Sequence, residues 1–236
     1  MRLVGFVVAT SLILASTLAA GNDTGDKKLP DAATLARQAA VRYEKDIASY
    51  TCTFEKTERI GDRLVGPARF SVRFREKPFS VHMRYLKEGL KGREVVFVEG
   101  KYDGKIMVKT GIANLILAIE TDSARAMRDN RHPITRFGVG HLARRMREQF
   151  ETAAAEGTLT AETLKREKVN GRDTWRVKRV LADGGTRFWN VDTATGLPIV
   201  VETFDAKDAL VERYRYLDFN ADVELDDDDF DVTRLW

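Results

Sequence analysis

Apolar and polar residues alternate over residues 70–85, and this alternation constrains the fold more than any other feature of the sequence. Successive side chains of a strand point to opposite faces of a sheet, so a period of two predicts strands with one apolar and one polar face. The apolar phase consists of Phe70, Val72, Phe74, Phe79, Val81, Met83 and Tyr85. A break at residues 76–78, which ends in Pro78, predicts that the two strands are antiparallel neighbours. What covers the apolar face of this sheet then decides what the protein can bind.

Further strand-like segments occur on both sides of this pair, separated by turn sequences about every ten residues. They span residues 51–60, 95–98, 105–109, 163–169, 174–180, 186–191, 199–205 and 211–219. This spacing predicts an antiparallel meander. Helical periodicity occurs before it, at residues 32–49, and interrupts it at residues 112–127 and 138–155. The expected fold is α+β: a large curved antiparallel sheet, with an N-terminal helix and a helical insert at about residues 112–155 covering its concave face.

The first twenty residues have the composition of a secretory signal peptide. A basic start is followed by an apolar stretch at residues 3–18, and Ala19 and Ala20 are small residues that suit cleavage by signal peptidase. The alternative is an uncleaved membrane anchor, which is disfavoured because the stretch is shorter than the roughly 20 residues of a spanning helix. We expect an exported, periplasmic protein with a signal peptide (1–20), a tether (21–30) and a single domain (31–236).

The composition disfavours nucleic-acid binding and several classes of enzyme. The formal charge is +3, and loss of the signal peptide leaves about +2, too small for nucleic acid to be the default partner. Cys52 is the single cysteine, and its position in phase with Phe54 predicts a small buried residue. His82, His132 and His141 lack metal-binding spacing, and neither a phosphate-binding loop nor a Gly-x-Ser-x-Gly elbow occurs. We expect no cofactor, no metal site and no catalytic residues.

The concave face of a curled sheet has to be filled or covered. If the predicted helices pack closely on it, its apolar side chains form an ordinary core. If they cover it loosely, the space between sheet and helices is a cavity suited to an acyl chain. The candidate lining residues in that case are Phe54, Phe70, Phe74, Val81, Met83, Tyr85, Trp175 and Trp189.

Two charged segments allow alternative interpretations. Within residues 138–155, Arg144, Arg145 and Arg147 surround an apolar stripe. We expect this stripe to face the core, and transient contact of the basic helix with a membrane is the alternative. The acidic run at residues 226–229 loosely resembles a calcium site in composition but lacks EF-hand spacing, so we expect a solvated turn there.

The order of elements resembles that of the LolA/RseB family of periplasmic lipoprotein carriers and sensors. The local match comprises residues 50–54, Lys77-Pro78 with Phe79, His82-Met83, and the C-terminal residues 216–230. More specifically, the sequence is similar to an uncharacterised bacterial family, the domain of unknown function DUF1571, over most of the mature chain. The residues that carry this similarity are Tyr50-x-Cys52, Lys56-x-Glu58-Arg59, Phe74-Arg75-x-x-Pro78-Phe79-Ser80-Val81, Gly92-Arg93-Glu94 and Arg131-His132-Pro133-Ile134.

The carrier resemblance implies a half-barrel with a helical lid that holds the acyl chains of lipoproteins. In the carriers, an arginine directly before the proline helps to hold the lid shut. Here Lys77 has that place, and Arg75 lies two residues earlier. Because lysine is a point charge and cannot form a bidentate fork, both Arg75 and Lys77 are latch candidates. We therefore expect a periplasmic binding protein for an apolar ligand, either a lipid or a lipidated protein.

Two other functions remain open at this point. An RseB-like sensor or scaffold would bind a protein partner, and an acidic partner could meet the polar-phase residues Arg73, Arg75 and Arg84. An exported hydrolase would need His82, His132 and Glu94 in one cleft.

Overall fold

The structure is a computed structural model that describes residues 29–86, 92–111 and 115–236. The predicted signal peptide and most of the predicted tether lie outside these residues. The described elements are α1 (Ala32–Asp46), β1 (Ser49–Ile60), β2 (Arg63–Arg75), β3 (Ser80–Tyr85), β4 (Glu94–Val98), η1 (Tyr102–Gly104), β5 (Ile106–Lys109), β6 (Ile116–Ile119), α2 (Ala124–Met127), η2 (Ile134–Arg136), α3 (Val139–Ala155), β7 (Ala161–Val169), β8 (Arg172–Val180), β9 (Thr186–Asp192), β10 (Pro198–Phe204), β11 (Leu210–Asn220), η3 (Asp228–Phe230) and α4 (Val232–Leu235). None of the described helices is long and apolar enough to cross a bilayer.

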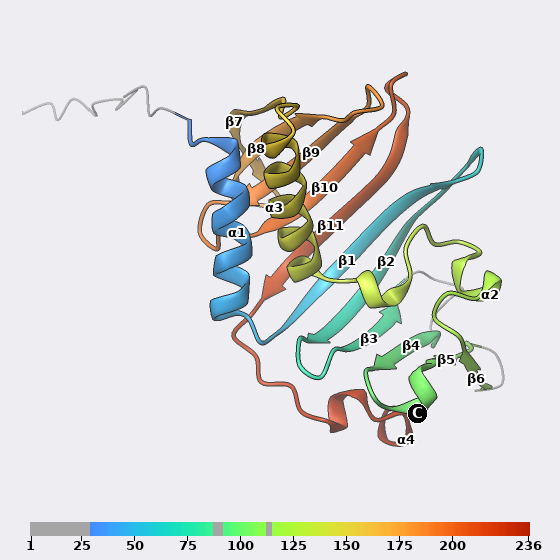
Figure 1. Cartoon of the computed structure of the whole chain (residues 1–236). Coiled ribbons are helices and arrows are strands. Elements are labelled where there is room, and N and C mark those ends of the chain that lie inside the picture. The colour runs from blue at the N-terminus through green and yellow to red at the C-terminus, as the bar shows by residue number, and fades with distance from the viewer. Residues whose placement is uncertain (1–28, 87–91, 112–114) are drawn as a thin grey trace, which may run out of the picture.

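The strands form one curved antiparallel sheet built from two meanders (Figure 1). The order β6-β5-β4-β3-β2-β1-β11-β10-β9-β8-β7 joins strands β1–β6 to strands β7–β11 through the pairing of β1 with β11. The predicted strand pair is confirmed, because β2 pairs with β3 and places Val72 opposite Met83 and Phe74 opposite Val81. The chain between β6 and β7, which contains α2, η2 and α3, lies over the concave face of the sheet (Figure 1).

Helices α1 and α3 pack side by side on the concave face (Figure 1). Asp31 caps α1 by accepting a hydrogen bond from the backbone N–H of Thr34 at 2.7 Å. Gly140 permits the close contact, because a Cβ atom there would lie 2.1 Å from a ring carbon of Tyr43. Phe150 of α3 in turn packs against Trp189 of β9, with 5.6 Å between ring centroids. The helices at residues 32–49 and 138–155 are thus confirmed, although the first ends at Asp46.

The helix predicted over residues 112–127 is wrong for residues 115–123, whereas residues 124–127 are helical and residues 112–114 lie outside the described part of the chain. Residues 116–119 form strand β6, which pairs with β5, and a helix begins only at Ala124, where the Ser123 side chain caps it. The spacing of Ile116 and Ile119 fits a helix, but Leu117 and Ile119 also form a period of two, and pairing with the free edge of β5 satisfies the backbone groups. Short apolar runs of this kind are ambiguous between the two periods.

The C-terminal residues 221–236 cross to the opposite, convex face of the sheet. There Phe230 and Val232 pack on Val96 and Val98 of β4 and form a second, smaller core. Asp227 pairs with Arg75 and Lys101, so the acidic run is an ion-paired segment and the predicted solvated turn is only partly correct. The convex side of β3 and β4 is therefore covered by the C-terminal segment.

Cys52 lies in the main core beneath the helices, as predicted from its phase. Its side chain is buried, and burial raises the pKa of its thiol far above the ordinary value. Because the thiolate is the reactive form, we expect Cys52 to be inert toward a disulfide reagent in the native protein and to react within seconds in denaturant. Absorbance of the thiolate released from the reagent measures this, and rapid native labelling would contradict the burial of Cys52 in the main core.

Candidate functional site

A cavity of about 830 Å³ lies between the concave face of the sheet and the chain from residue 121 to residue 149, and strands β1–β6 and β9–β11 contribute side chains to it. This volume is within the range of about 300–1,000 Å³ that is typical of small-molecule sites. One wall is apolar and consists of half-buried side chains that include Tyr85, Val95, Val108, Leu117 and Ile119. The opposite wall, formed by the insert, contributes Ile134, Phe137 and Leu142. The cavity thus contains an apolar slot with strands on one side and the insert on the other, and charged and polar residues line the rest of it.

The structure places five of the eight predicted lining residues at this cavity: Phe54, Phe70, Met83, Tyr85 and Trp189. Phe74 and Val81 belong to the same apolar face, but both are buried in the adjacent core. Phe137 covers this region, with its ring centroid 4.9 Å from that of Phe54 and 6.1 Å from that of Phe74. Trp175 lies further along the face, half-buried, with the Arg166 guanidinium 5.9 Å from its ring centroid. The helices therefore fill one end of the concave face and leave the other end open.

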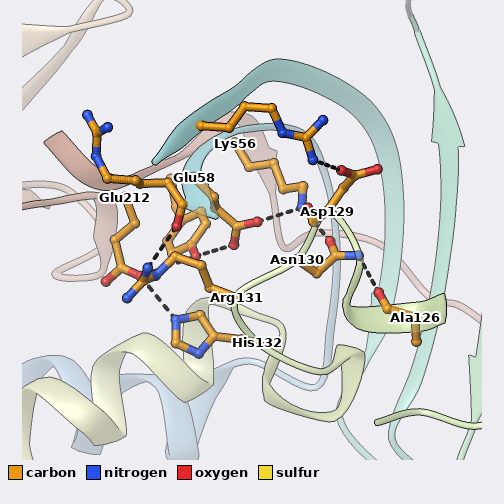
Figure 2. Close-up of polar contacts among 11 residues, drawn as sticks. Lys56, Glu58, Ala126, Asp129, Asn130, Arg131, His132 and Glu212 are labelled. Atoms are coloured by element: carbon orange, nitrogen blue, oxygen red, sulfur yellow. Dashed lines mark hydrogen bonds and ion pairs between the residues drawn. The ribbon is translucent and has the colours of Figure 1, made fainter. Parts of the chain in front are cut away.

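A buried polar network lies at the inner end of the cavity (Figure 2). Glu58 of β1 is only 3% exposed, accepts a hydrogen bond from Lys56 Nζ at 2.8 Å and accepts another from the Tyr214 hydroxyl. Lys56 Nζ also donates to the backbone oxygen of Asp129, at 3.0 Å, and to the side-chain oxygen of Asn130. A buried carboxylate without such partners would cost several kcal/mol, so the network fixes β1 to the insert.

Glu212 of β11 is the second buried carboxylate of the network. Its oxygens lie 3.0 Å from His132 Nε2 and 3.2 Å from Arg187 Nη2, and Thr203 Oγ1 donates to it at 3.0 Å. Burial alone would raise the pKa of Glu212, but the hydrogen bond from His132 and the charge of Arg187 outweigh it and hold the pKa at about 2. Burial and the two nearby carboxylates raise the pKa of Tyr214, which therefore stays a neutral donor. Glu212 is thus a permanent anion that anchors His132.

The segment from Ala126 to His132 forms one side of the cavity, and the network holds it against the sheet. In Figure 2 the side chain of Asn130 points toward Lys56, and those of Arg131 and His132 point toward Glu212 on the sheet. Asn130 also donates to the backbone oxygen of Ala126, at 2.6 Å, and Asp129 pairs with Arg63 at 2.8 Å. The Lys56-x-Glu58-Arg59 and Arg131-His132 residues, which carried part of the similarity to DUF1571, meet at this point.

Sequence reasoning missed Glu212, Tyr214 and Arg187. A usable pattern was present, because Glu212 is in phase with Tyr214 and Tyr216 on the apolar face of β11. Lys56 and Glu58 are likewise in phase with Phe54 on β1. A charged residue in the apolar phase of a strand requires a buried partner, and its position along the strand marks where the cavity becomes polar.

The latch candidates Arg75 and Lys77 flank a third residue that contacts both helices. Arg75 pairs with Asp227 at 2.8 Å on the convex side, and Lys77 is exposed at the turn. Between them, Glu76 accepts a hydrogen bond from the Tyr43 hydroxyl of α1 at 2.7 Å and pairs with Arg144 of α3 at 3.0 Å. Glu76 is therefore the residue of this turn that holds the helices.

On the convex face, the arginines and the histidine that the alternative functions require already have partners within the chain. His82 Nε2 lies 2.6 Å from Glu94, whereas His132 bonds Glu212 on the concave face, so the three residues of the hydrolase hypothesis do not form one cleft. The acidic groups near the outward-facing arginines belong to the chain itself, since Arg73 pairs with Asp229 and Arg84 with Glu94. These ion pairs remove the sequence argument for an acidic protein partner.

His141 of α3 also lines the cavity, and the charges around it shift its pKa. Burial lowers the pKa of His141, and Arg145, Arg144, His132 and Arg136 lower it further, to about 4. We expect its ring proton resonances to titrate near pH 4, well below the pH at which an unperturbed histidine titrates. Histidine-selective NMR, assigned with His141→Gln, measures this value, and a midpoint near 6.5 would contradict a positive, partly desolvated environment.

Comparisons with known proteins agree with this architecture. The model of a family described as a protein of unknown function, DUF1571, matches residues 47–234. A search of the curated proteins finds no match. Among solved structures, MucB superposes with a TM-score of 0.52 at 15% identity, over 85% of this chain and 62% of MucB. The lipoprotein LppX of Mycobacterium tuberculosis superposes with a TM-score of 0.51 at 11% identity, over 82% of this chain and 97% of LppX.

MucB has also been solved in the MucA/MucB complex of Pseudomonas aeruginosa, which superposes with a TM-score of 0.50 at 17% identity, over 85% of this chain and 60% of that chain. The chain thus spans about three fifths of the length of MucB. Together, the topology and these superpositions confirm the predicted half-barrel fold of the LolA/RseB type. At identities this low the similarity concerns the fold alone.

Proposed function

The chain belongs to the DUF1571 family, and we propose that it is an exported binding protein whose cavity takes the apolar chain of a lipid or of a lipidated protein. The cavity carries this proposal. Its apolar wall is only half-buried by the protein's own side chains, and contact with a ligand would bury the rest of that surface. Exposed apolar surface of this kind is uncommon in soluble domains that bind nothing.

The polar contacts around the cavity join structural elements to one another, and this favours binding over catalysis. The buried polar network uses its donors and acceptors to join β1, β11 and the insert, and Glu76 joins the two helices to the β2–β3 turn. Such contacts hold the two walls at a fixed separation before any ligand arrives. Preorganisation of this kind lowers the entropic cost of binding.

Similarity to MucB and LppX supports the proposal at the level of fold. MucB is known in complex with the protein MucA, and LppX is a lipoprotein. A protein ligand could enter this cavity through an attached acyl chain, so a lipid and a lipidated protein present the same chemistry to it. The proposed export rests on the apolar stretch at residues 3–18.

Native mass spectrometry of the protein purified from its own host tests this function. We expect a mass above that of the polypeptide, which organic extraction removes. The extracted protein should then bind one equivalent of a fluorescent fatty acid. An unliganded mass together with no binding of the probe would contradict the proposal.

A further inference from the structure

The rim of the cavity carries more positive than negative charge. Among the described residues, seven lysine or arginine side chains line the cavity against three carboxylates. The buried carboxylates Glu58 and Glu212 are already paired with Lys56 and Arg187. The excess of positive charge is therefore at the solvent-facing rim and not in the interior.

Three arginines of the insert account for most of this excess. Arg125 lies in α2, Arg128 is the first residue after α2, and Arg136 is the last residue of η2. All three are exposed residues that line the cavity, and within the described chain none of them has an ion-pair partner. The nearby Asp129 is paired with Arg63, so it does not neutralise them. Three like charges held on one short segment repel one another unless an anion lies between them.

His141 lies in positive surroundings on the same side of the cavity, and Arg136 of the rim contributes to them. Burial is the largest cause of its low pKa, and cationic neighbours on α3, on η2 and in the adjoining loop lower the pKa further. The apolar wall formed by β3–β6 faces this cationic rim across the cavity. One compact site thus presents an apolar slot and a positive mouth.

We propose that the ligand of this cavity is an anionic amphiphile, whose acyl chain lies against β3–β6 and whose carboxylate or phosphate headgroup is bound at the rim by Arg125, Arg128 and Arg136. The inference rests on the proposed function and narrows its ligand class. Arginine suits both headgroups, because its planar fork binds carboxylate and phosphate oxygens in pairs. An acidic headgroup would also account for the absence of a partner for these arginines within the described residues.

A set of probes with one chain and different headgroups tests this. Extracted protein is titrated with a fluorescent sixteen-carbon chain ending in a carboxylate, a neutral alcohol or a trimethylammonium group, and inorganic phosphate is added as a competitor. We expect the carboxylate to bind about ten-fold tighter than the alcohol and the ammonium to bind weakest. Phosphate alone should not displace the probe, and displacement would indicate a site for free anions instead.

The double variant R125Q/R128Q should reduce the preference for the carboxylate several-fold and leave the affinity for the alcohol unchanged. The matched control is R37Q/R42Q on the outer face of α1, which removes the same charge away from the cavity and should keep the preference. Equal binding of the carboxylate and the alcohol by the natural protein would overturn this inference alone. Failure of every chain to bind would instead overturn the proposed function.

Discussion

Replacement of Val95 by tryptophan is expected to abolish binding of a fatty-acid probe without unfolding the protein. Val95 is half-buried and lies between Met83 of β3 and Val108 of β5, and all three side chains line the cavity. An indole at this position would extend into the cavity, so it competes with the ligand and not with the core. We expect affinity to fall by at least about ten-fold, which corresponds to 1.4 kcal/mol of binding free energy.

Fluorescence titration gives the affinity, and thermal unfolding checks the fold. The midpoint should stay within about 3 °C of the natural protein, because a residue that fills a cavity does not displace packed neighbours. The matched control is Val41→Trp on the exposed side of α1, where the side chain is 57% exposed. If Val95→Trp bound the probe as tightly as Val41→Trp, the apolar slot would not be the binding site.

The substitution Glu212→Gln is expected to cause the largest loss of stability. It removes the anion that Arg187 and His132 surround and leaves the Arg187 guanidinium, whose side chain is only 21% exposed, without its charged partner. The difference between the ordinary pKa of 4.5 and the folded pKa of about 2 corresponds to about 3 kcal/mol of unfolding free energy. For a chain of this length, that loss lowers the melting temperature by about 10 °C.

The pH dependence distinguishes this mechanism from a simple packing defect. Because the folded pKa of Glu212 is depressed, its contribution is complete above about pH 4.5 and declines as the pH falls toward 2. The free-energy difference between natural protein and variant, measured by urea unfolding, should therefore shrink over that interval. Glu162→Gln is the control, since its side chain is 61% exposed and its substitution should cost less than about 1 kcal/mol. A difference that is constant with pH would contradict the charge pairing.

Local sequence patterns were sufficient to predict most of the sheet. The Asn170-Gly171 pair predicted a hairpin, and both residues adopt the positive φ angles that such a turn needs, which sets Val169 opposite Arg172. The alternation over residues 70–85 placed Phe70, Met83 and Tyr85 on the correct face, because a period of two fixes the face of every residue once one is known. Both signals are contained within a few neighbouring residues.

The candidate site was harder to predict because it is assembled from distant segments. Glu58 and Glu212 belong to strands separated by more than half of the chain, and His132 comes from an insert whose path over the sheet no local pattern describes. The same applies to Phe74 and Val81, which share a face with the cavity residues. Whether they face the cavity or pack in the core depends on where Phe137 lies. Pairing of β6 with β5 similarly overrode the helical spacing of Ile116 and Ile119.

The location of the bound chain tests the central claim most directly. A fatty acid with a nitroxide near its methyl end is added to protein with labelled methyl groups, and the loss of methyl signal is measured by NMR. We expect strong attenuation at Val95, Val108 and Leu117, which line the cavity, and none at the exposed Val41 and Val180. Equal attenuation at both sets, or none at the cavity set, would show that the chain does not enter the space between sheet and insert.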